Sequence, residues 1–467
     1  NPSGKFHVGM KPASELFPPS ALRRLKTQVQ AEWDAELSLL RRTADRNKDE
    51  DLVAAEAKAD ADRSREEQNL VALHEAKVAL EDAYASSGPG LVYDCVLWND
   101  GTNWRVIIDT NRNGDLADDL VIRPYGVAGE YGTFDTHTNA TYAVQVYEDG
   151  DLLSIVTMSG AHGTHVSSIA SSNFPDDPDR NGVAPGAQIL SIKIGDLRGG
   201  GGSYGPSERR AVATAARYGV DIMNASWGGS STYQDGGDHN AMNYKLLADR
   251  FDILAVMSAG NEGPALSTAG SAGGESSRVL GVGAYASEEM GKALYNTIKD
   301  SPDAALQFSS RGPTKDGDLG VDIMAPGAAW ASTSAETLGS AGMYNGTSMS
   351  APSTSGVAAL VLSAAKQNGL NPRPALMRKA MMLGATPIDE EATFTRGAGL
   401  ANAGGAWAKL QELASEPAFD VFYDVAVTGG TFVDRGRGLY LREPIDELRR
   451  HVMVDVAPHW PESIAAV

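Results

Sequence analysis

The chain has 467 residues, of which 42% are hydrophobic, and its formal net charge is −20 at pH 7. This length predicts a globular protein of two or three domains, and the acidic balance without a basic cluster excludes a nucleic-acid-binding protein. The sequence contains no apolar run of about 18 residues that would span a membrane, and its single cysteine, Cys95, excludes an internal disulfide.

The first third of the chain predicts three segments of different character. Residues 1–18 contain Gly and Pro and are expected to form an arm. Residues 19–88 are rich in Ala, Glu, Lys, Arg and Leu, which predicts a hairpin of two amphipathic helices, broken near Asn47–Asp51. Residues 89–158 alternate apolar and polar residues between turns such as NDGT and EDGD, which predicts a β-meander.

From residue 159 onward, short apolar runs alternate with helical stretches. The expected strands are AQILSIKIG, VDIMNASWG, DILAVMSAG and SRVLGVGAYA, and the expected helices are 162–172, 206–218, 240–250 and 348–366. Such alternation predicts an α/β domain over residues 159–416, with a parallel sheet covered by helices on both faces. Residues 417–467 return to strand-like alternation and are expected to begin a β-rich domain.

A hydroxyl residue, Ser348, stands at the start of the last of these helices, in NGTSMSAPSTSG. Pro352 is tolerated only in the first helical turn, so Ser348 is expected at the helix N-terminus. Free backbone N–H groups and the helix dipole favour negative charge there, which suits a nucleophile whose attack generates an oxyanion. A simple N-cap serine is the alternative interpretation, and only suitable partners decide between the two.

Two residues are candidate partners of Ser348. His162 opens a helix of small residues and is a candidate base for a serine nucleophile, whereas His165 is expected to face the core. Asn261 follows a fully apolar strand, where the catalytic groups of open α/β sheets gather. Its amide would supply one oxyanion donor and the backbone N–H of Ser348 the other. Taken singly, His162 also fits a packing role and Asn261 a turn.

Seven motifs together resemble those of the subtilisin-like serine peptidases, and they occur in that family's order: HGTHV, NGVAPGAQILSIKI, NASWGG, SAGNEGP, SSRGP, IMAPG and GTSMSAP. Within the family, NPSGKFHVGMK, LLSIVTMSGAHGTHV and GRGLYLREP resemble the tripeptidyl-peptidase II branch. The resemblance implies Ser348 as nucleophile, His162 as general base and Asn261 as oxyanion donor. It also implies an aminopeptidase-like enzyme that acts on oligopeptides, uses no cofactor or metal, lies in the cytoplasm and forms a homo-oligomer when full length.

The family's catalytic Asp is the one expected element that the sequence lacks. In the family it lies in a D-T-G motif before a long insertion, and the resemblance implies that residues 1–158 are most of that insertion. We therefore expect a fragment that hydrolyses peptides poorly. Asp109 in VIIDTNRNGD is a weak substitute, because Asn111 replaces the expected Gly. The same stretch resembles a calcium loop, but Leu120 at its twelfth position favours an Asn-Gly hairpin turn instead.

Two stretches, RGGGGSYG (198–205) and ASWGG (225–229), are expected to pair with an extended peptide substrate. The candidate substrate-binding residues are Gly201, Gly202, Ser203, Ser226, Trp227 and Gly228. In the tripeptidyl-peptidase II branch, acidic side chains in these stretches hold the free amino terminus of the substrate. Ser203 and Gly229 stand at those positions here, so the sequence leaves open whether the protein is an exopeptidase or an endopeptidase.

Two classes of function remain after this comparison of motifs. The first is a serine peptidase of the subtilisin type, and the second is an inactive assembly or scaffold protein that retains the fold. GGSYG (201–205) also fits the G-x-S-x-G pattern of esterases. It follows glycines rather than a strand, so Ser203 is the weaker candidate nucleophile.

Overall fold

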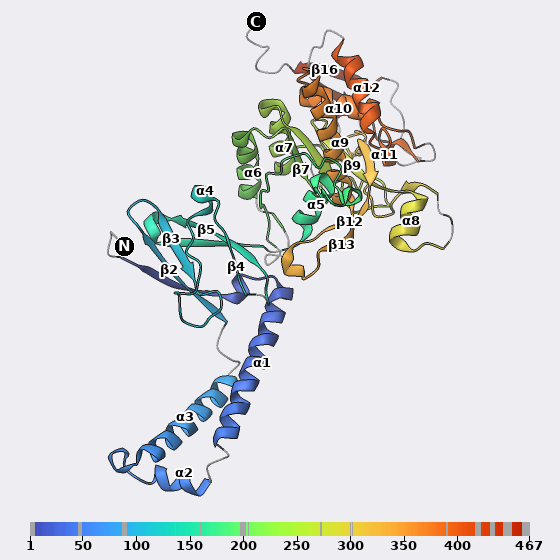
Figure 1. Ribbon diagram of the computed structural model, residues 1–467. Helices are drawn as coiled ribbons and strands as arrows, with labels where there is room; N and C mark the ends of the chain where they lie inside the picture. Colours follow the sequence, from blue (N-terminus) through green and yellow to red (C-terminus); the bar gives the residue numbers. More distant parts are fainter. Residues whose placement is uncertain are drawn as a thin grey trace. The chain divides into compact units, whose positions relative to one another are not determined.

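The computed structural model describes residues 5–44, 49–85, 91–135, 137–158, 160–196, 202–203, 205–270, 273–298, 300, 302–388, 391–415, 422–429, 435–441 and 451–459. The chain divides into two compact units (Figure 1). Unit 1 comprises residues 1–161, 196–201 and 335–339, and unit 2 comprises residues 162–195, 202–334 and 340–467. In the part of the chain that the structure describes, no helix is long and apolar enough to cross a membrane.

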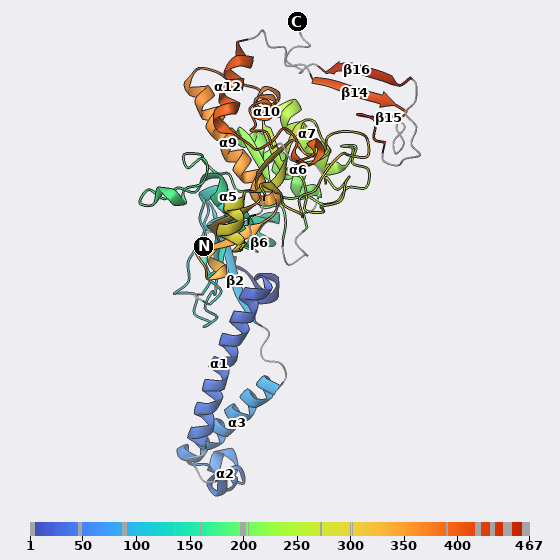
Figure 2. The same ribbon diagram turned by 90° about the vertical axis from the view of Figure 1, so that its right-hand side faces the viewer.

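Unit 1 contains three α-helices within residues 19–88, where the sequence predicted two. They are α1 (Pro19–Ala44), α2 (Asp49–Glu56) and α3 (Arg65–Ala85), with α3 beside α1 (Figure 2). The predicted break falls partly on residues 45–48, which lie outside the described residues. The short helix α2 was not predicted, and a 3₁₀ turn at Asp60–Asp62 follows it.

Two antiparallel sheets complete unit 1, together with the short helix α4 (Tyr125–Ala128). The first has the order β1 (His7–Pro12), β2 (Val92–Asn99), β3 (Trp104–Ile108), and the second the order β4 (Gly132–Thr133), β5 (Thr141–Tyr147), β6 (Leu152–Thr157). The segment expected as an arm therefore supplies an edge strand. Both sheets contribute to a core that includes Phe17, Tyr93, Val106, Phe134 and Tyr142.

Unit 2 is built on the predicted parallel sheet. Its parallel strands, in spatial order, are β7 (Ile222–Ala225), β8 (Leu254–Ser258), β9 (Val279–Ala286) and β11 (Ile323–Pro326). The two-residue strand β10 (Ala304–Ala305) pairs antiparallel with the end of β9. The strands read as continuous apolar runs because both faces of the sheet are buried.

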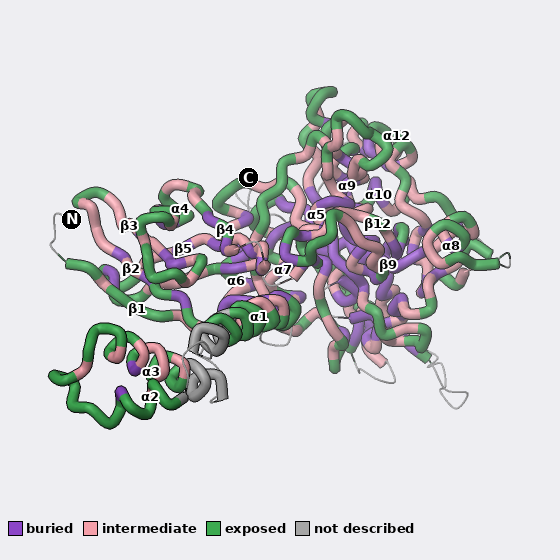
Figure 3. The backbone as a smooth tube through the Cα atoms, turned by 60° about the horizontal axis from the view of Figure 1, so that its bottom comes forward, coloured by how far each residue is buried: buried purple, intermediate pink, exposed green. Residues whose placement is uncertain are grey.

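Helices cover both faces of this sheet, as predicted. Leu254 and Val256 of β8 belong to the core under α9 (Thr347–Gln367), α10 (Pro374–Leu383) and α12 (Ala403–Ala414). Ala255 and Met257 point to the opposite face, into the core under α6 (Gly205–Tyr218) and α7 (His239–Phe251). Figure 3 shows the resulting concentration of buried residues around β9 and α9. The remaining helices of unit 2 are α5 (His162–Ser171), α8 (Glu288–Tyr295) and α11 (Thr393–Arg396).

One predicted strand is wrong. Residues 187–194, in the apolar run AQILSIKIG, are extended without ladder pairing, and within the described residues the run's only bridge joins Gly195 to Ser203. Ile189 and Leu190 are exposed. The apolar run indicated a buried strand, but a strand also needs a hydrogen-bonded neighbour, and sequence periodicity does not report that neighbour.

Two smaller β-structures follow the main sheet in the chain. The hairpin β12 (Ala328–Ser332) and β13 (Ala341–Asn345) precedes α9 directly. The last sheet has the order β15 (Arg435–Gly436), β14 (Phe422–Thr428), β16 (Met453–His459) (Figure 2). It lies within residues 417–467, where the sequence predicted strands.

Candidate active site

Ser348 is the second residue of α9, where backbone N–H groups are free to point at a ligand. The helix begins at Thr347, and its N-cap is Gly346, whose φ of +149° favours glycine. Ser348 is therefore not the N-cap, which removes the simpler interpretation of this serine. Its half-buried side chain donates through Oγ to the carbonyl of Ser226, 3.2 Å away.

Asn261 lies three residues after β8 and is held against the start of α9. Its Oδ1 accepts from the backbone N–H of Thr347 at 2.9 Å and from the Thr347 hydroxyl at 3.0 Å. A Cβ atom placed on Gly346 would lie 3.6 Å from the Ser348 nitrogen and 3.8 Å from Nδ2 of Asn261. The Ser348 nitrogen and both atoms of the Asn261 amide, with Oδ1 at 3.6 Å, thus lie around the position that a side chain at Gly346 would fill.

His162 is the first residue of α5, and its side chain is exposed. Desolvation by nearby protein atoms and, to a smaller extent, the charge of His165 lower the pKa of His162 below its ordinary value, which favours the neutral imidazole. No hydrogen bond joins His162 to another residue in the part of the chain that the structure describes. His165 is buried, stacks on Tyr344 at 4.3 Å and places Nε2 3.0 Å from the Gly342 carbonyl, which confirms that it faces the core.

The stretch after β7 comes directly against the start of α9. Ser226 is buried, and its Oγ donates to the Ser348 carbonyl at 2.8 Å. Together with the bond that Ser348 donates in return, this makes a reciprocal contact between the two segments. Trp227 is half-buried, and Gly228 is exposed with a φ of +155°. These residues leave the sheet at the carboxyl end of β7, where α/β folds bind ligands.

The glycine-rich stretch is described only in part. Gly201 lies outside the described residues, and Gly202 and Ser203 are half-buried. The Ser203 hydroxyl donates to the carboxylate of Glu208, a fully buried residue of α6. Burial raises the pKa of Glu208, and the Ser203 hydrogen bond opposes that rise. Ser203 is therefore turned toward a buried acid.

Asp109 organises its own turn in unit 1. Its two carboxylate oxygens accept from the backbone N–H groups of Asn113 at 3.2 Å and Gly114 at 2.9 Å. Gly114 has a φ of +77°, which fits the Asn-Gly turn predicted for this stretch. Among the described residues, no group of three or more His, Cys, Asp or Glu side chains is arranged to hold a metal ion.

The carboxyl group of Glu275, on the loop before β9, was not singled out by the sequence. The residue is 1% exposed, and burial raises its pKa to about 8, with the neighbouring Asp238 and the charge of Asp235 adding to the effect. Glu275 thus stays protonated in the folded protein over a range in which the unfolded chain has released its proton. Raising the pH from about 4.5 to about 8 must therefore weaken folding through this group.

We expect Glu275→Gln to remove this pH dependence, because the amide mimics the protonated carboxyl group. The variant should be close to the wild type near pH 5 and gain on the order of 4 kcal/mol in free energy of unfolding at pH 8.5. Urea denaturation at both pH values measures the effect. Glu289→Gln, at an exposed position of α8, is the matched control and should follow the wild type. Equal pH slopes for Glu275→Gln and the wild type would contradict the expectation.

The structure combines a parallel sheet covered by helices with a serine in the first turn of α9, the arrangement that the subtilisin-like motifs predicted. Residues 67–405 match the family model of Peptidase S8, the Subtilase family. The chain therefore belongs to the Subtilase family.

Within that family, the comparisons point to one enzyme in particular. The chain is 36% identical to tripeptidyl-peptidase 2 of Arabidopsis thaliana, over 95% of this chain and 32% of that protein. The Caenorhabditis elegans tripeptidyl-peptidase 2 is 35% identical, over 95% of this chain and 32% of that protein. Pyrolysin of Pyrococcus furiosus is 27% identical over 73% of this chain and 28% of its own length.

The solved structures agree with the sequence relatives. The crystal structure of tripeptidyl peptidase 2 matches 98% of this chain and 34% of its own, with 28% identity and a TM-score of 0.67. The chain spans about a third of the length of these relatives. These similarities confirm the resemblance that the motifs indicated.

Proposed function

We propose that this protein is a serine peptidase, related to tripeptidyl-peptidase 2, that cleaves oligopeptides through an acyl-enzyme on Ser348. The observation that carries the proposal is the position of Ser348 in the first turn of α9, with the amide of Asn261 held against the same turn through Thr347. A side-chain amide and a free backbone N–H beside a serine hydroxyl suit the oxyanion of an acyl-transfer intermediate.

In the proposed mechanism, Ser348 Oγ attacks the substrate carbonyl carbon while neutral His162 takes the hydroxyl proton. The carbonyl oxygen becomes an oxyanion and accepts hydrogen bonds from Asn261 Nδ2 and the Ser348 backbone N–H. When the C–N bond breaks, His162 gives its proton to the leaving amine. Water, activated by His162, then hydrolyses the ester and regenerates Ser348. The lowered pKa of His162 supports its role, because only neutral imidazole accepts a proton.

A carboxylate must also orient His162 in this mechanism. Asp109 is unsuited to that task, because both of its oxygens already accept backbone hydrogen bonds in its own turn. We propose that the carboxylate comes from sequence outside residues 1–467.

The proposed substrates are oligopeptides bound in extended form along the stretch from Ser226 to Gly228. By similarity to tripeptidyl-peptidase 2, we further propose a homo-oligomeric protein of the cytoplasm. The exposed, glycine-containing backbone after β7 supports strand pairing with a peptide. Gly202 and Ser203 belong to the proposed second side of this cleft, and we assign Gly201 to it from sequence alone.

The function is tested by incubating the natural full-length protein with a chromogenic peptide and with a fluorophosphonate probe. Peptide hydrolysis that stops when the probe reacts with one serine is the expected result, because both reactions need the same activated nucleophile. Peptide mapping of the labelled serine locates it in the chain. A folded protein that binds peptides without hydrolysis or labelling would instead favour the inactive scaffold.

Acetylation of the substrate's amino terminus is expected to change kcat/KM by less than about threefold, because Ser203 and Gly229 place no carboxylate at the two anchor positions to pair with an ammonium group. Glu208, the carboxylate that Ser203 contacts, is 0% exposed and unavailable to a peptide. Gly229 brings no side chain at the other anchor position. The measurement compares acetylated and free forms of one chromogenic tripeptide.

A loss of about a hundredfold on acetylation corresponds to about 2.7 kcal/mol of transition-state stabilisation. That result would reveal an acidic anchor and restore strict release of tripeptides, the activity that the relatives' name describes. The two outcomes thus separate an endopeptidase from a tripeptidyl-peptidase.

A further inference from the structure

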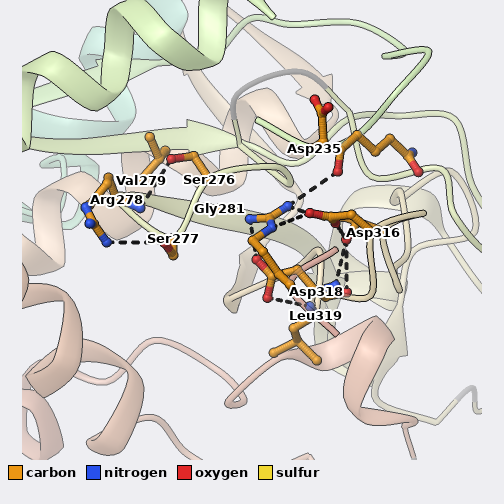
Figure 4. A network of polar contacts seen from close by, with 12 residues as sticks. Asp235, Ser276, Ser277, Arg278, Val279, Gly281, Asp316, Asp318 and Leu319 are labelled. Carbon is orange, nitrogen blue, oxygen red and sulfur yellow. Dashed lines mark hydrogen bonds and ion pairs between the residues drawn. The ribbon is translucent and has the colours of Figure 1, made fainter. Parts of the chain in front are cut away.

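Arg437, which follows β15, is held by two loops that lie far from it in the sequence. Its Nε donates to Asp316 Oδ2 at 2.6 Å and its Nη2 to Asp316 Oδ1 at 3.1 Å. Nη1 lies 2.5 Å from Asp318 Oδ2, and Nη2 also donates to the Gln234 carbonyl at 3.4 Å. Figure 4 shows Asp316 and Asp318 at this network of contacts. A bidentate ion pair of this kind fixes the orientation of the guanidinium and carboxylate groups as well as the distance between them.

The backbone on either side of Arg437 packs closely against the loop that carries Asp316. The N–H of Gly438 donates to the Asp316 carbonyl at 2.9 Å. A Cβ atom on Gly436 would lie 2.3 Å from the Asp316 carbonyl oxygen, and one on Gly438 would lie 2.3 Å from that of Gly317. Both positions therefore need glycine for this close approach. The sequence RGRG at 435–438 is explained by this contact.

Gln234 extends the network toward the candidate cleft. The residue is 2% exposed and has a φ of +55°, a backbone angle that is uncommon for residues other than glycine. Its Nε2 donates to the carbonyls of Ser267 and Ala269, both at 2.8 Å. Its Oε1 accepts from the backbone N–H of Lys315 at 3.3 Å. One buried amide thus contacts three loops, two of which are also linked by the bond from Lys315 Nζ to the Thr232 carbonyl at 2.7 Å.

The loops joined by Gln234 border one side of the proposed cleft, the stretch from Ser226 to Gly228. Gln234 lies on the connection from Gly229 to α7, directly after the substrate stretch. Gly270 packs on that stretch, since a Cβ there would be 2.6 Å from the Gly229 carbonyl oxygen. The Gly270 N–H donates to the Ala259 carbonyl at 2.8 Å, two residues before Asn261.

We propose that Arg437 is a positioning residue for peptide binding: by holding Asp316 and the Gln234 carbonyl, it fixes the connection from Gly229 to α7 and thereby the adjoining stretch from Ser226 to Gly228 that pairs with the substrate backbone. This inference rests on the proposed function of that stretch. Asp316 is 4% exposed, so without Arg437 its charge would be buried and unpaired, and its loop would rearrange. Arg437 itself touches no reacting atom.

The test measures two properties of Arg437→Ala and Arg437→Lys in the natural full-length protein. With a chromogenic oligopeptide, Arg437→Ala should raise KM about tenfold and change kcat less than about threefold, because binding is lost equally from ground and transition states. Arg437→Lys should raise KM about threefold, because lysine keeps the charge but lacks the fork. In a Ser348→Ala background, the Kd of the same peptide should rise by the same factors.

The matched control is Arg435→Ala. Arg435 lies two residues away, and its exposed side chain pairs only with the exposed Asp455 at 3.2 Å among the ion pairs of the described residues. It should keep wild-type KM and Kd. The fluorophosphonate labelling rate should stay within about twofold in all variants, because the small probe does not use the extended stretch.

Several results would overturn the inference. One is a KM and Kd for both Arg437 variants equal to those of Arg435→Ala. Another is a fall of kcat and labelling rate in step with binding, which would indicate general damage to the fold. If Arg437→Ala does not fold, Arg437→Lys decides alone. Peptide binding with the expected Arg437 dependence, but without labelling of the wild type, supports the inference and refutes only the peptidase mechanism.

Discussion

Replacing Ser348 with Ala is expected to lower kcat by about 10⁶-fold and to abolish fluorophosphonate labelling, because no other group supplies the attacking oxygen. The loss should leave the fold intact, since the hydroxyl makes one 3.2 Å bond to the Ser226 carbonyl. Peptide binding should also persist, because substrate contacts lie along the backbone after β7. Active-site labelling, steady-state kinetics and the Kd for a peptide measure the three properties.

The matched control for this variant is Ser363→Ala, at an exposed serine of the same helix, which should behave as the wild type. The decisive comparison is with Ser203→Ala. If labelling survived in Ser348→Ala and vanished in Ser203→Ala, the nucleophile would be the serine of GGSYG, and the proposed assignment would be wrong.

The second large effect is expected at Asn261, where Ala should lower kcat by about 10²–10³-fold with little change in KM. The amide Nδ2 stabilises charge that exists only after attack, so its loss raises the barrier more than it weakens substrate binding. Asn261 Oδ1 also holds the N–H of Thr347 at 2.9 Å, so truncation alone would mix two effects.

Asn261→Asp separates the two effects. A carboxylate keeps the acceptor for Thr347 but replaces the donor Nδ2 with a second oxygen that repels an oxyanion. We expect its kcat to be at least as low as that of Asn261→Ala, while the thermal stability stays near that of the wild type. If Asp restored activity, the role of Asn261 would be to hold α9 in place rather than to donate to the oxyanion.

The elements of unit 2 that the sequence predicted correctly share one property: their local pattern is unambiguous. The apolar runs of β7, β8 and β9 and the small-residue helices α5 and α9 lie where they were expected. Ser348 was identified because it lies in the first turn of α9, and Asn261 because it lies shortly after β8. The structure places both residues beside Gly346. The short helix α2 and the unpaired run at 187–194 were missed, because short or isolated segments depend on neighbours that periodicity does not report.

The polar residues that hold the loops together could not be predicted from the sequence, for a different reason. Gln234 and Arg437 are separated by 203 positions, and Arg437 and Asp316 by 121. Each is a single polar residue in a loop, without the repeated spacing that marks a helix or a strand. Only the folded chain shows that such residues meet, since loops of this kind are defined by their partners rather than by local preference.

The division of the chain into units does not follow the order of the sequence. The tip of the β12–β13 hairpin, residues 335–339, belongs to unit 1, although both strands of that hairpin belong to unit 2. There Arg24 donates to the Glu336 carbonyl at 2.6 Å and Asn139 to the Ala335 carbonyl at 3.2 Å. Unit 1 is thus made of three separate segments of the chain, and no single cut separates the two units. A truncation at residue 161 would remove Arg24 and Asn139 and so strip this tip of both donors.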